Sequence, residues 1–313
     1  MPIWINQSDG TQEIAVLLFN RFSNYCLANT VEPMRAANDA LGRTAYRWRL
    51  LSLDGEPVTS SSGMQLMPDG KLSDVPGGDA LFILPSYAYR TFGTPACLDA
   101  LRAAARRFET LAGLDAGSWL LAEAGLLNGY SATIHFDEFD RFSERFPEVT
   151  ARRERWIVDR DRMSAGGATT AFELMQHLIA STHGAAVSIE IAGLFMQGDE
   201  SAGARGGPTP GDRRVQRALT VMRGNLETPL SVADLARAAG CRQRDLEVRF
   251  RRAFGATPRT VYRQLRMAEA LRLVRDGDLS IAEISLRCGY SDPSAFTRAF
   301  RATHGRAPRN LEA

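Results

Sequence analysis

The chain has 313 residues, of which 44% are hydrophobic and 24% charged, and its formal net charge is +2. This length suits two domains with separate cores, and the ordinary balance of apolar and charged residues excludes a disordered or fibrous protein. No apolar stretch approaches the roughly 20 residues of a membrane-spanning helix, and the first residues do not resemble a secretion signal, so we expect a cytoplasmic protein without membrane contact.

The first two thirds of the chain alternate between short apolar runs and helical patterns. Strands separated by helices in this way indicate an α/β domain with a mostly parallel sheet. We expect strands at residues 13–19, 46–53, 80–84, 110–114, 131–136 and 155–158, and helices at 31–41, 95–108, 118–124, 170–183 and 185–197.

A segment rich in Gly, Pro and small polar residues follows, without apolar periodicity. This composition is typical of a flexible linker. The sequence therefore predicts an N-terminal domain at 1–197, a linker at 198–212 and a C-terminal domain at 213–313. The cysteines lack the paired spacing of metal ligands, so we expect reduced thiols, no metal and no cofactor. They are Cys26, Cys97, Cys241 and Cys288.

After the linker the patterns are helical throughout and the charge changes sign. Residues 213–313 hold 20 Arg, no Lys and 10 acidic residues, a net charge of +10, which leaves −8 for the rest of the chain. A basic domain on an acidic body is the pattern of a DNA-binding module attached to a domain that does not touch DNA. Solvated arginine-rich helices without a partner are the alternative.

The basic segment contains a helix-turn-helix pattern twice. Ser231 and Ser280 have the position of helix N-caps, and Gly240 and Gly289 stand at the turns, both pairs 49 residues apart. The pairs at a spacing of 50 are Leu246/Phe296, Phe250/Phe300, Gly255/Gly305 and Pro258/Pro308. The sequence thus predicts an all-α domain with two helix-turn-helix units, joined by a helix at 260–276.

The second helix of each unit is expected in the major groove of DNA, where its early residues reach base edges. Arg suits guanine and Gln suits adenine, although some of the arginines alternatively hold only phosphates. The candidate DNA-binding residues are Arg242, Gln243, Arg244, Arg249, Ser291, Asp292, Ser294, Thr297, Arg298 and Arg301.

Two further segments of the second copy are highly specific: Gly289-Tyr-Ser-Asp-Pro-Ser-Ala-Phe and the closing Phe300-Arg-Ala-Thr-His-Gly-Arg-Ala-Pro. Together with the duplication they resemble the DNA-binding domain of the AraC family of transcriptional regulators, over residues 213–313. The resemblance implies two recognition helices in adjacent major grooves, and transcriptional activation as the usual outcome.

In the N-terminal domain, residues 111–129 have the pattern of a strand, a sharp turn and a helix. Asp115 stands at the turn, and His135 follows twenty residues later in Ser131-Ala-Thr-Ile-His-Phe. With the stretch Val31-Glu-Pro-Met-Arg-Ala-Ala-Asn, these segments resemble class I glutamine amidotransferase-like (PfpI-like) domains over residues 13–197. The resemblance implies a flavodoxin-like or amidotransferase-like sandwich.

Catalytic relatives in that family carry Cys where this chain has Asp115. A thiolate at a helix N-terminus is an activated nucleophile, whereas a carboxylate there is stabilised by the helix dipole but attacks amides poorly. The sequence therefore predicts a domain without amidase or protease activity. The replacement resembles the subgroup that contains the regulators of arginine, glycine betaine and carnitine catabolism.

A retained pocket with an anionic floor suits a cationic or zwitterionic metabolite, because aromatic rings and carboxylates both attract ammonium groups. For each aromatic candidate, packing in the core is the alternative to ligand contact. For Phe136, which is also considered, core packing is favoured. His135 either bonds to Asp115 or contacts the ligand, and Glu32 either faces the pocket or caps the first helix. The candidate ligand-binding residues are Asn24, Tyr25, Glu32, Ser86, Tyr87, Asp115, Trp119, His135 and Trp156.

These features predict a sequence-specific DNA-binding regulator of catabolic genes, expected to act as an activator that responds to a small nitrogenous metabolite. The expected partners are double-stranded DNA, the effector, a second copy of the chain and, as a further candidate, RNA polymerase. Two alternatives stay open. One is an amidotransferase- or deglycase-type enzyme joined to a DNA-binding domain, and the other is a DNA-binding dimer that needs no ligand.

Overall fold

The computed structural model describes residues 10–196 and 212–310 and divides into two compact units, Met1–Thr182 and His183–Ala313. The linker predicted at 198–212 lies outside the described residues, apart from Asp212. The helix predicted at 185–197 is α6 (Ala185–Met196), which the sequence assigned to the first domain. It belongs to the second unit, because Ala185 and Ile189 join the apolar cluster of α7 (Arg213–Arg223) and α10 (Pro258–Asp276). None of the described helices is long and apolar enough to cross a membrane.

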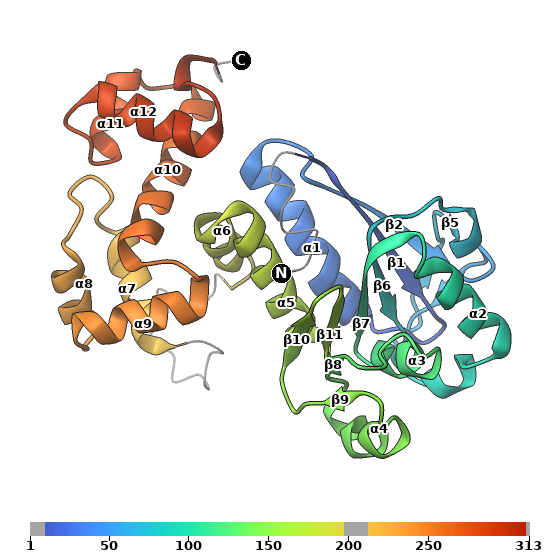
Figure 1. Ribbon diagram of the computed structural model, residues 1–313. Coiled ribbons are helices and arrows are strands. Elements are labelled where there is room, and N and C mark those ends of the chain that lie inside the picture. The colour runs from blue at the N-terminus through green and yellow to red at the C-terminus, as the bar shows by residue number, and fades with distance from the viewer. Residues whose placement is uncertain (1–9, 197–211, 311–313) are drawn as a thin grey trace. The chain divides into compact units, whose positions relative to one another are not determined.

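A seven-stranded sheet forms the centre of the first unit, in the order β10-β11-β7-β6-β1-β2-β5 (Figure 1). Neighbouring strands are parallel, apart from the antiparallel pair β10 and β11. The strands are β1 (Gln12–Leu18), β2 (Tyr46–Ser52), β5 (Gly70–Lys71), β6 (Gly78–Leu84), β7 (Phe108–Leu114), β10 (Trp156–Asp159) and β11 (Arg162–Ala165). Short strands β3 (Val58–Thr59) and β4 (Gln65–Leu66) pair with each other, as do β8 (Ser131–Ala132) and β9 (Thr150–Ala151).

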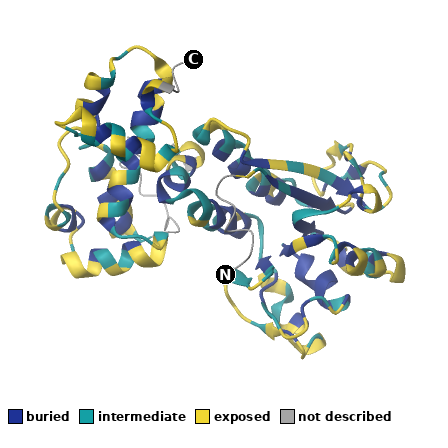
Figure 2. Cartoon of the chain, turned by 45° about the horizontal axis from the view of Figure 1, so that its top comes forward, coloured by how far each residue is buried: buried dark blue, intermediate teal, exposed yellow. Residues whose placement is uncertain are grey.

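The central strands β1, β6 and β7 are buried along almost their whole length, which Figure 2 shows in dark blue. Continuous burial is expected of a parallel sheet that helices cover on both faces. Figure 1 shows α1 (Asn24–Leu41) and α5 (Ala168–His183) on one side of the sheet and α2 (Pro95–Ala104) and α3 (Gly117–Glu123) on the other. The α/β class predicted for this part of the chain is confirmed.

The helices of the first unit are α1 (Asn24–Leu41), α2 (Pro95–Ala104), α3 (Gly117–Glu123), α4 (Phe139–Arg145) and α5 (Ala168–His183). Single 3-10 turns lie at Leu72–Asp74, Tyr89–Phe92 and Phe136–Glu138. The start of α1 was predicted at residue 31, but the helix begins earlier because the Ser23 side chain caps it. The Ser23 hydroxyl accepts a hydrogen bond from the N–H of Cys26 at 3.2 Å.

Two further elements differ from the prediction. The strand expected at 131–136 ends at Ala132, because the N–H of Thr133 donates to the Ser164 hydroxyl (2.9 Å) and the chain then turns through His135. The strand β11 was not predicted, since Arg162-Met-Ser-Ala has no apolar run to mark it.

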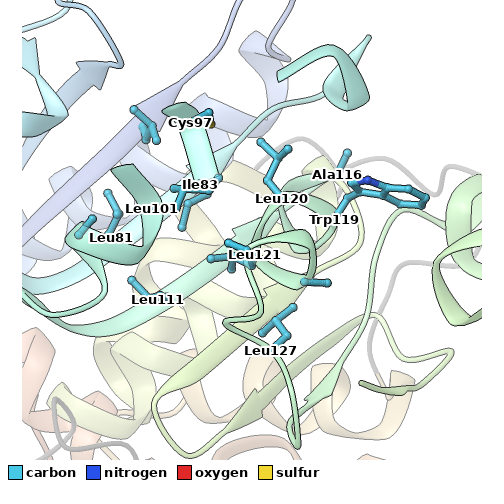
Figure 3. Packing of buried hydrophobic residues seen from close by; sticks show 14 of the residues in the cluster. Leu81, Ile83, Cys97, Leu101, Leu111, Ala116, Trp119, Leu120, Leu121 and Leu127 are labelled. Atoms are coloured by element: carbon cyan, nitrogen blue, oxygen red, sulfur yellow. The ribbon is translucent and has the colours of Figure 1, made fainter. Parts of the chain in front are cut away.

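The apolar core between the sheet and α2 and α3 brings β6, β7 and the two helices together (Figure 3). Leu81 and Ile83 of β6 meet Cys97 and Leu101 of α2 in this cluster. Trp119 of α3 belongs to the same cluster and is 6% exposed. This core therefore holds α3, and with it the turn that precedes α3, against the sheet.

The second unit is helical, as predicted. Besides α6, its helices are α7 (Arg213–Arg223), α8 (Val232–Ala238), α9 (Gln243–Phe254), α10 (Pro258–Asp276), α11 (Ile281–Arg287) and α12 (Pro293–His304), followed by a 3-10 turn at Pro308–Asn310. The pairs α8/α9 and α11/α12 are the two helix-turn-helix units. Each has its own apolar core, built around Leu246 and Phe250 in one and Phe296 and Phe300 in the other, and α10 contributes to both.

The predicted N-caps are present in both units. The Ser231 hydroxyl accepts from the N–H of Asp234 (3.1 Å), and the Ser280 hydroxyl accepts from the N–H of Glu283 (3.3 Å). Glu283 also accepts from the Ser280 N–H, which completes a capping box. Each cap fixes where the first helix of its unit starts.

The turn glycines share a backbone conformation but differ in their surroundings. Gly240 and Gly289 have φ of +72° and +73°. A Cβ on Gly240 would meet nothing closer than 3.9 Å, whereas one on Gly289 would lie 2.7 Å from the carbonyl oxygen of Leu226 and 2.8 Å from the ring of Pro229.

We expect Gly240→Ala to cost about 1–2 kcal/mol of unfolding free energy, the penalty of the left-handed conformation. Gly289→Ala carries the same penalty and must also displace backbone, so its loss should be larger by about 1 kcal/mol or more. Urea denaturation of both variants beside the wild type measures the difference. Equal losses would show that the close approach of Gly289 to Leu226 does not constrain the second unit.

Candidate functional site

The turn between β7 and α3 places one carboxyl at the end of the sheet. Its sequence is Gly113-Leu-Asp115-Ala-Gly117, and Asp115 has φ +58°, in the left-handed region. A Cβ on Gly117 would lie 2.1 Å from the carbonyl oxygen of Ile83, and one on Gly113 would lie 2.5 Å from the N–H nitrogen of Ser118. Only glycine fits at these positions, and the turn has the strand–turn–helix geometry of a nucleophile elbow. The turn predicted from the sequence is thus present.

Asp115 is partly buried beside Ser86 and His135. Burial raises the pKa of the Asp115 carboxyl, although a hydrogen bond from Ser86 and the charge of His135 oppose the rise. The N–H of His135 donates to the Asp115 carbonyl oxygen at 3.1 Å, so the two residues are also joined through the backbone. Burial, and secondly the charge of Asp115, raise the pKa of the Cys26 thiol well above its usual value. The Cys26 sulfur, which lies close enough to Asp115 to feel its charge, is therefore a thiol rather than a reactive thiolate.

Ser86 links this turn to the start of α1. The N–H of Ser23, the residue that caps α1, donates to the Ser86 hydroxyl at 2.9 Å. The neighbouring Asn24 points elsewhere: its amide donates to the hydroxyls of Ser60 (3.0 Å) and Ser62 (2.6 Å). Ser86 therefore holds the Asp115 carboxyl, whereas Asn24, a candidate lining residue, holds the β3–β4 segment and does not line the hollow.

A hollow of about 420 Å³ lies next to His135. This volume falls in the range of small-molecule sites. Segments distant in sequence form its wall: the start of α1, residues 133–139, residues 153–155 and the start of α5. The lining residues are Tyr25, Thr133, Ile134, His135, Phe136, Phe139, Arg153, Glu154, Arg155, Gly166, Gly167, Ala168, Thr169 and Thr170.

The wall of the hollow combines two kinds of group. It includes aromatic rings, of which Tyr25 is 61% and Phe136 is 74% exposed. It also includes the first turn of α5, whose leading N–H groups have no partner within the helix and carry the positive end of its dipole. Gly166 allows this turn to approach residues 133–135, because a Cβ there would lie 2.7 Å from the Ile134 carbonyl oxygen.

The two arginines in the wall already have acidic partners. Arg155 makes two hydrogen bonds to the Glu173 carboxylate, at 2.7 and 2.6 Å. Arg153 pairs with Asp140, and its guanidinium lies 4.3 Å from the centre of the Phe139 ring. Their charges are therefore largely balanced, and the helix N-terminus is the main positive feature of the wall.

Of the nine ligand-binding candidates, Tyr25 and His135 line the hollow, Asp115 lies near His135, and Ser86 is hydrogen-bonded to Asp115. Trp119 does not, because it packs in the core against Phe146 at a ring distance of 5.0 Å. Trp156 stacks on His177 at 4.5 Å.

Glu32 and Tyr87 are the other candidates that lie outside the wall. The carboxylate of Glu32 accepts from Arg35 one turn along α1, at 2.7 Å, so it neither caps the helix nor faces the hollow. Tyr87 is exposed, with the guanidinium of Arg21 at 5.7 Å from its ring. Sequence reasoning missed the start of α5, although the pair Gly166-Gly167 before a helix was a visible signal.

In the second unit, α9 and α12 each turn one face inward and leave the other exposed. Leu246 and Phe250 fix the inner face of α9, and Phe296 and Phe300 fix that of α12. Eight of the ten DNA-binding candidates are exposed along these helices or at their starts: Arg242, Gln243, Arg244, Ser291, Asp292, Ser294, Arg298 and Arg301. Val248 and Arg251 of α9 are also exposed and were not among the candidates.

Four of the ten candidates also make contacts within the unit. Arg249 is half-buried and pairs with Asp212, the N-cap of α7, so in this structure it holds α9 against α7. Asp292 caps α12, since its carboxylate accepts from the N–H groups of Ser294 (2.8 Å) and Ala295 (3.1 Å).

Two more candidates have side chains engaged on their own helices. The Thr297 hydroxyl donates to the Pro293 carbonyl oxygen at 2.9 Å, and the Gln243 amide donates to Glu247 at 2.9 Å. Arg244, Arg298 and Arg301 are therefore the long cationic candidates on the outer faces.

Comparison with protein families matches both units. Residues 12–181 match the DJ-1/PfpI family, and residues 235–313 match a helix-turn-helix domain.

Curated relatives match along nearly the whole chain. The HTH-type transcriptional regulator CdhR of Pseudomonas aeruginosa is 35% identical over 95% of this chain and 90% of its own length. The regulators ArgR and GbdR of Pseudomonas aeruginosa are 33% and 31% identical, over 95% and 97% of this chain and 92% and 85% of their own lengths. The similarity therefore extends across both units.

Solved structures match the first unit. A crystal structure of an AraC family transcriptional regulator from Pseudomonas putida has a TM-score of 0.51 and 25% identity, over 59% of this chain and 99% of that one. A ThiJ/PfpI family protein from Pseudomonas syringae has a TM-score of 0.53 at 21% identity, over 66% of this chain and 84% of that one, and supports the fold alone.

The raised pKa of Asp115 predicts a pH-dependent effect of Asp115→Asn. At a pH below the usual pKa of Asp the folded and unfolded states both hold the proton, and the folded state loses stability as the pH rises through its own, higher pKa. Asn cannot ionise and tolerates the left-handed conformation. We expect Asp115→Asn to melt at a higher temperature than the wild type near about pH 8, with the gap closing toward about pH 4.

Asp99→Asn is the control, because that side chain lies on the surface of α2 with 74% exposure. It should show no such trend. A gap between Asp115→Asn and the wild type that widens as the pH falls would contradict the assigned environment.

Proposed function

This chain belongs to the HTH-type transcriptional regulators that join a DJ-1/PfpI domain to an AraC-type helix-turn-helix domain, and we propose that a small cationic or zwitterionic nitrogenous metabolite controls it. The protein is a sequence-specific DNA-binding regulator of transcription. The proposal concerns its input: an effector bound in the hollow beside His135, in a unit that we further propose to be without catalytic activity.

The mixed chemistry of the wall is the observation that carries this proposal. Tyr25 and Phe136 are exposed aromatic residues of the wall, and Glu154 belongs to the same wall. Aromatic rings and a carboxylate suit an ammonium or quaternary ammonium group. The first-turn N–H groups of α5, which also belong to the wall, suit a carboxylate. A metabolite that carries both charges on a short chain complements both kinds of group.

The chemistry of Asp115 supports a receptor rather than an enzyme. The elbow geometry is retained, but the group that it presents is a carboxyl whose pKa is raised by burial, beside a buried Cys26 thiol. A carboxyl is a poor nucleophile toward amides and does not start the acyl transfer that a thiolate starts at such a turn. Amide hydrolysis by the wild type that disappears in Asp115→Ala would overturn this part of the proposal.

For the output, we propose that two copies of the chain associate through the first unit and that effector binding changes how the paired DNA-binding units engage DNA. Two linked units gain avidity on tandem half-sites. The effector must bind two conformations with different affinity for such control. We further propose that the DNA-bound dimer activates transcription of catabolic genes through contact with RNA polymerase.

A thermal-shift screen of amino acids, betaines and carnitine tests the input. We expect a zwitterion to raise the melting temperature, and choline, which lacks a carboxylate, to bind more weakly than glycine betaine. Tyr25→Ala and Phe136→Ala should each weaken the best compound roughly 2- to 30-fold, the range of a cation–π contact.

Met67→Ala is the matched control, because Met67 is 72% exposed and does not line the hollow. It should leave affinity for the compound unchanged. The proposal fails if no compound shifts the melting temperature and DNA binding is indifferent to all of them.

On the DNA side, we expect Arg244→Ala and Arg298→Ala to weaken binding to the specific site by about 1–3 kcal/mol, the value of a base contact. Electrophoretic mobility shifts at fixed salt, on the specific duplex and on random duplex, measure both affinities. A loss of the same size on both duplexes would mean that the guanidinium contacts only phosphate.

A further inference from the structure

The recognition helix α9 exposes an aliphatic side chain among cations. Val248 is 57% exposed, although the inner face of the same helix buries Leu246 and Phe250 completely. Arg244 and Arg251, four residues before and three residues after Val248, share its face of the helix and are exposed. A single exposed aliphatic residue is common on protein surfaces. Val248 differs from such residues by its position in the helix-turn-helix repeat.

The duplication places Val248 in register with Arg298. Both residues lie midway between two core positions, Leu246 and Phe250 in α9, and Phe296 and Phe300 in α12. Both also point away from the core, since each is exposed. Val248 therefore occupies in the first unit the place from which the second unit presents a guanidinium.

We infer that Val248 contacts the C5-methyl group of a thymine in the first half of the DNA site. That methyl group is the apolar feature of the major-groove edge of a base pair, and apolar side chains read it by contact. An arginine at the equivalent place of α12 suits guanine. At equivalent places, α9 thus contacts a thymine methyl group and α12 contacts a guanine. The two halves of the DNA site are therefore not interchangeable. The inference rests on the outward, DNA-facing orientation of α9.

The first experiment obtains the site and then removes methyl groups from it. The full chain selects its site from a random duplex library, and each thymine in the half bound by α9 is replaced in turn by deoxyuridine, which lacks only the C5-methyl. At one thymine we expect deoxyuridine to weaken wild-type binding about 3- to 5-fold, the effect of one buried methyl. Val248→Ala should lose a similar factor and should be indifferent to deoxyuridine at that same thymine.

Leu286→Ala is the matched control, because Leu286 of α11 is 60% exposed and lies outside the recognition helices. This variant should keep the full sensitivity to deoxyuridine. A Val248→Ala protein with wild-type affinity, or with undiminished sensitivity at every thymine, would overturn the inference.

A second variant tests the register with Arg298 directly. Val248→Arg restores in α9 the side chain that α12 carries at the equivalent place, so repeated selection should replace the thymine by guanine at the affected position. An unchanged preference for thymine would count against the inference. A wild-type chain that selects no sequence at all would instead refute specific DNA binding, so the two failures are distinguishable.

Discussion

The close approach of α3 to the end of β6 is the constraint on which the first unit depends. Gly117 lies so near the Ile83 carbonyl oxygen that no side chain fits, and Asp115 is forced into the left-handed region just before it. This turn places the Asp115 side chain at the C-terminal ends of the parallel strands. Ligands bind at this edge of the sheet in open α/β folds. The hydrogen bond from the His135 N–H to the Asp115 carbonyl oxygen then fixes the position of His135 in the wall of the hollow. The turn therefore has the geometry of a nucleophile elbow while it presents the carboxyl of Asp115.

The architecture of both units could be predicted from sequence, because it depends on local signals. Apolar runs predicted the central strands, and the spacing of Ser280, Gly289 and Phe300 from their counterparts predicted two like units. These signals act within one or two turns of chain, where caps and core faces are determined. The position of α6 was not predictable in this way, since its strong apolarity suits either unit and only the packing of Ile189 against the helices of the second unit decides.

The wall of the hollow was mostly hidden from the sequence. Tyr25, His135 and the start of α5 are far apart along the chain, and nothing local indicates that they meet. The aromatic candidates were equally ambiguous. Trp119 was a candidate for ligand contact but packs in an aromatic core cluster, whereas Phe136, for which core packing was favoured, is 74% exposed. Which way a ring points depends on the packing of distant segments. The same holds for Arg249, whose partner Asp212 precedes it by 37 residues.

The helix α10 gives side chains to both apolar cores of the second unit: Val261 and Leu265 enter one, and Leu271 and Val274 enter the other. It is a single uninterrupted helix of 19 residues, so its length sets the distance between the two recognition helices. One added residue would lengthen α10 by about 1.5 Å and rotate one recognition helix relative to the other by roughly 100°. The length of α10 therefore sets the spacing between the base pairs that the two recognition helices contact, although α10 itself need not touch a base.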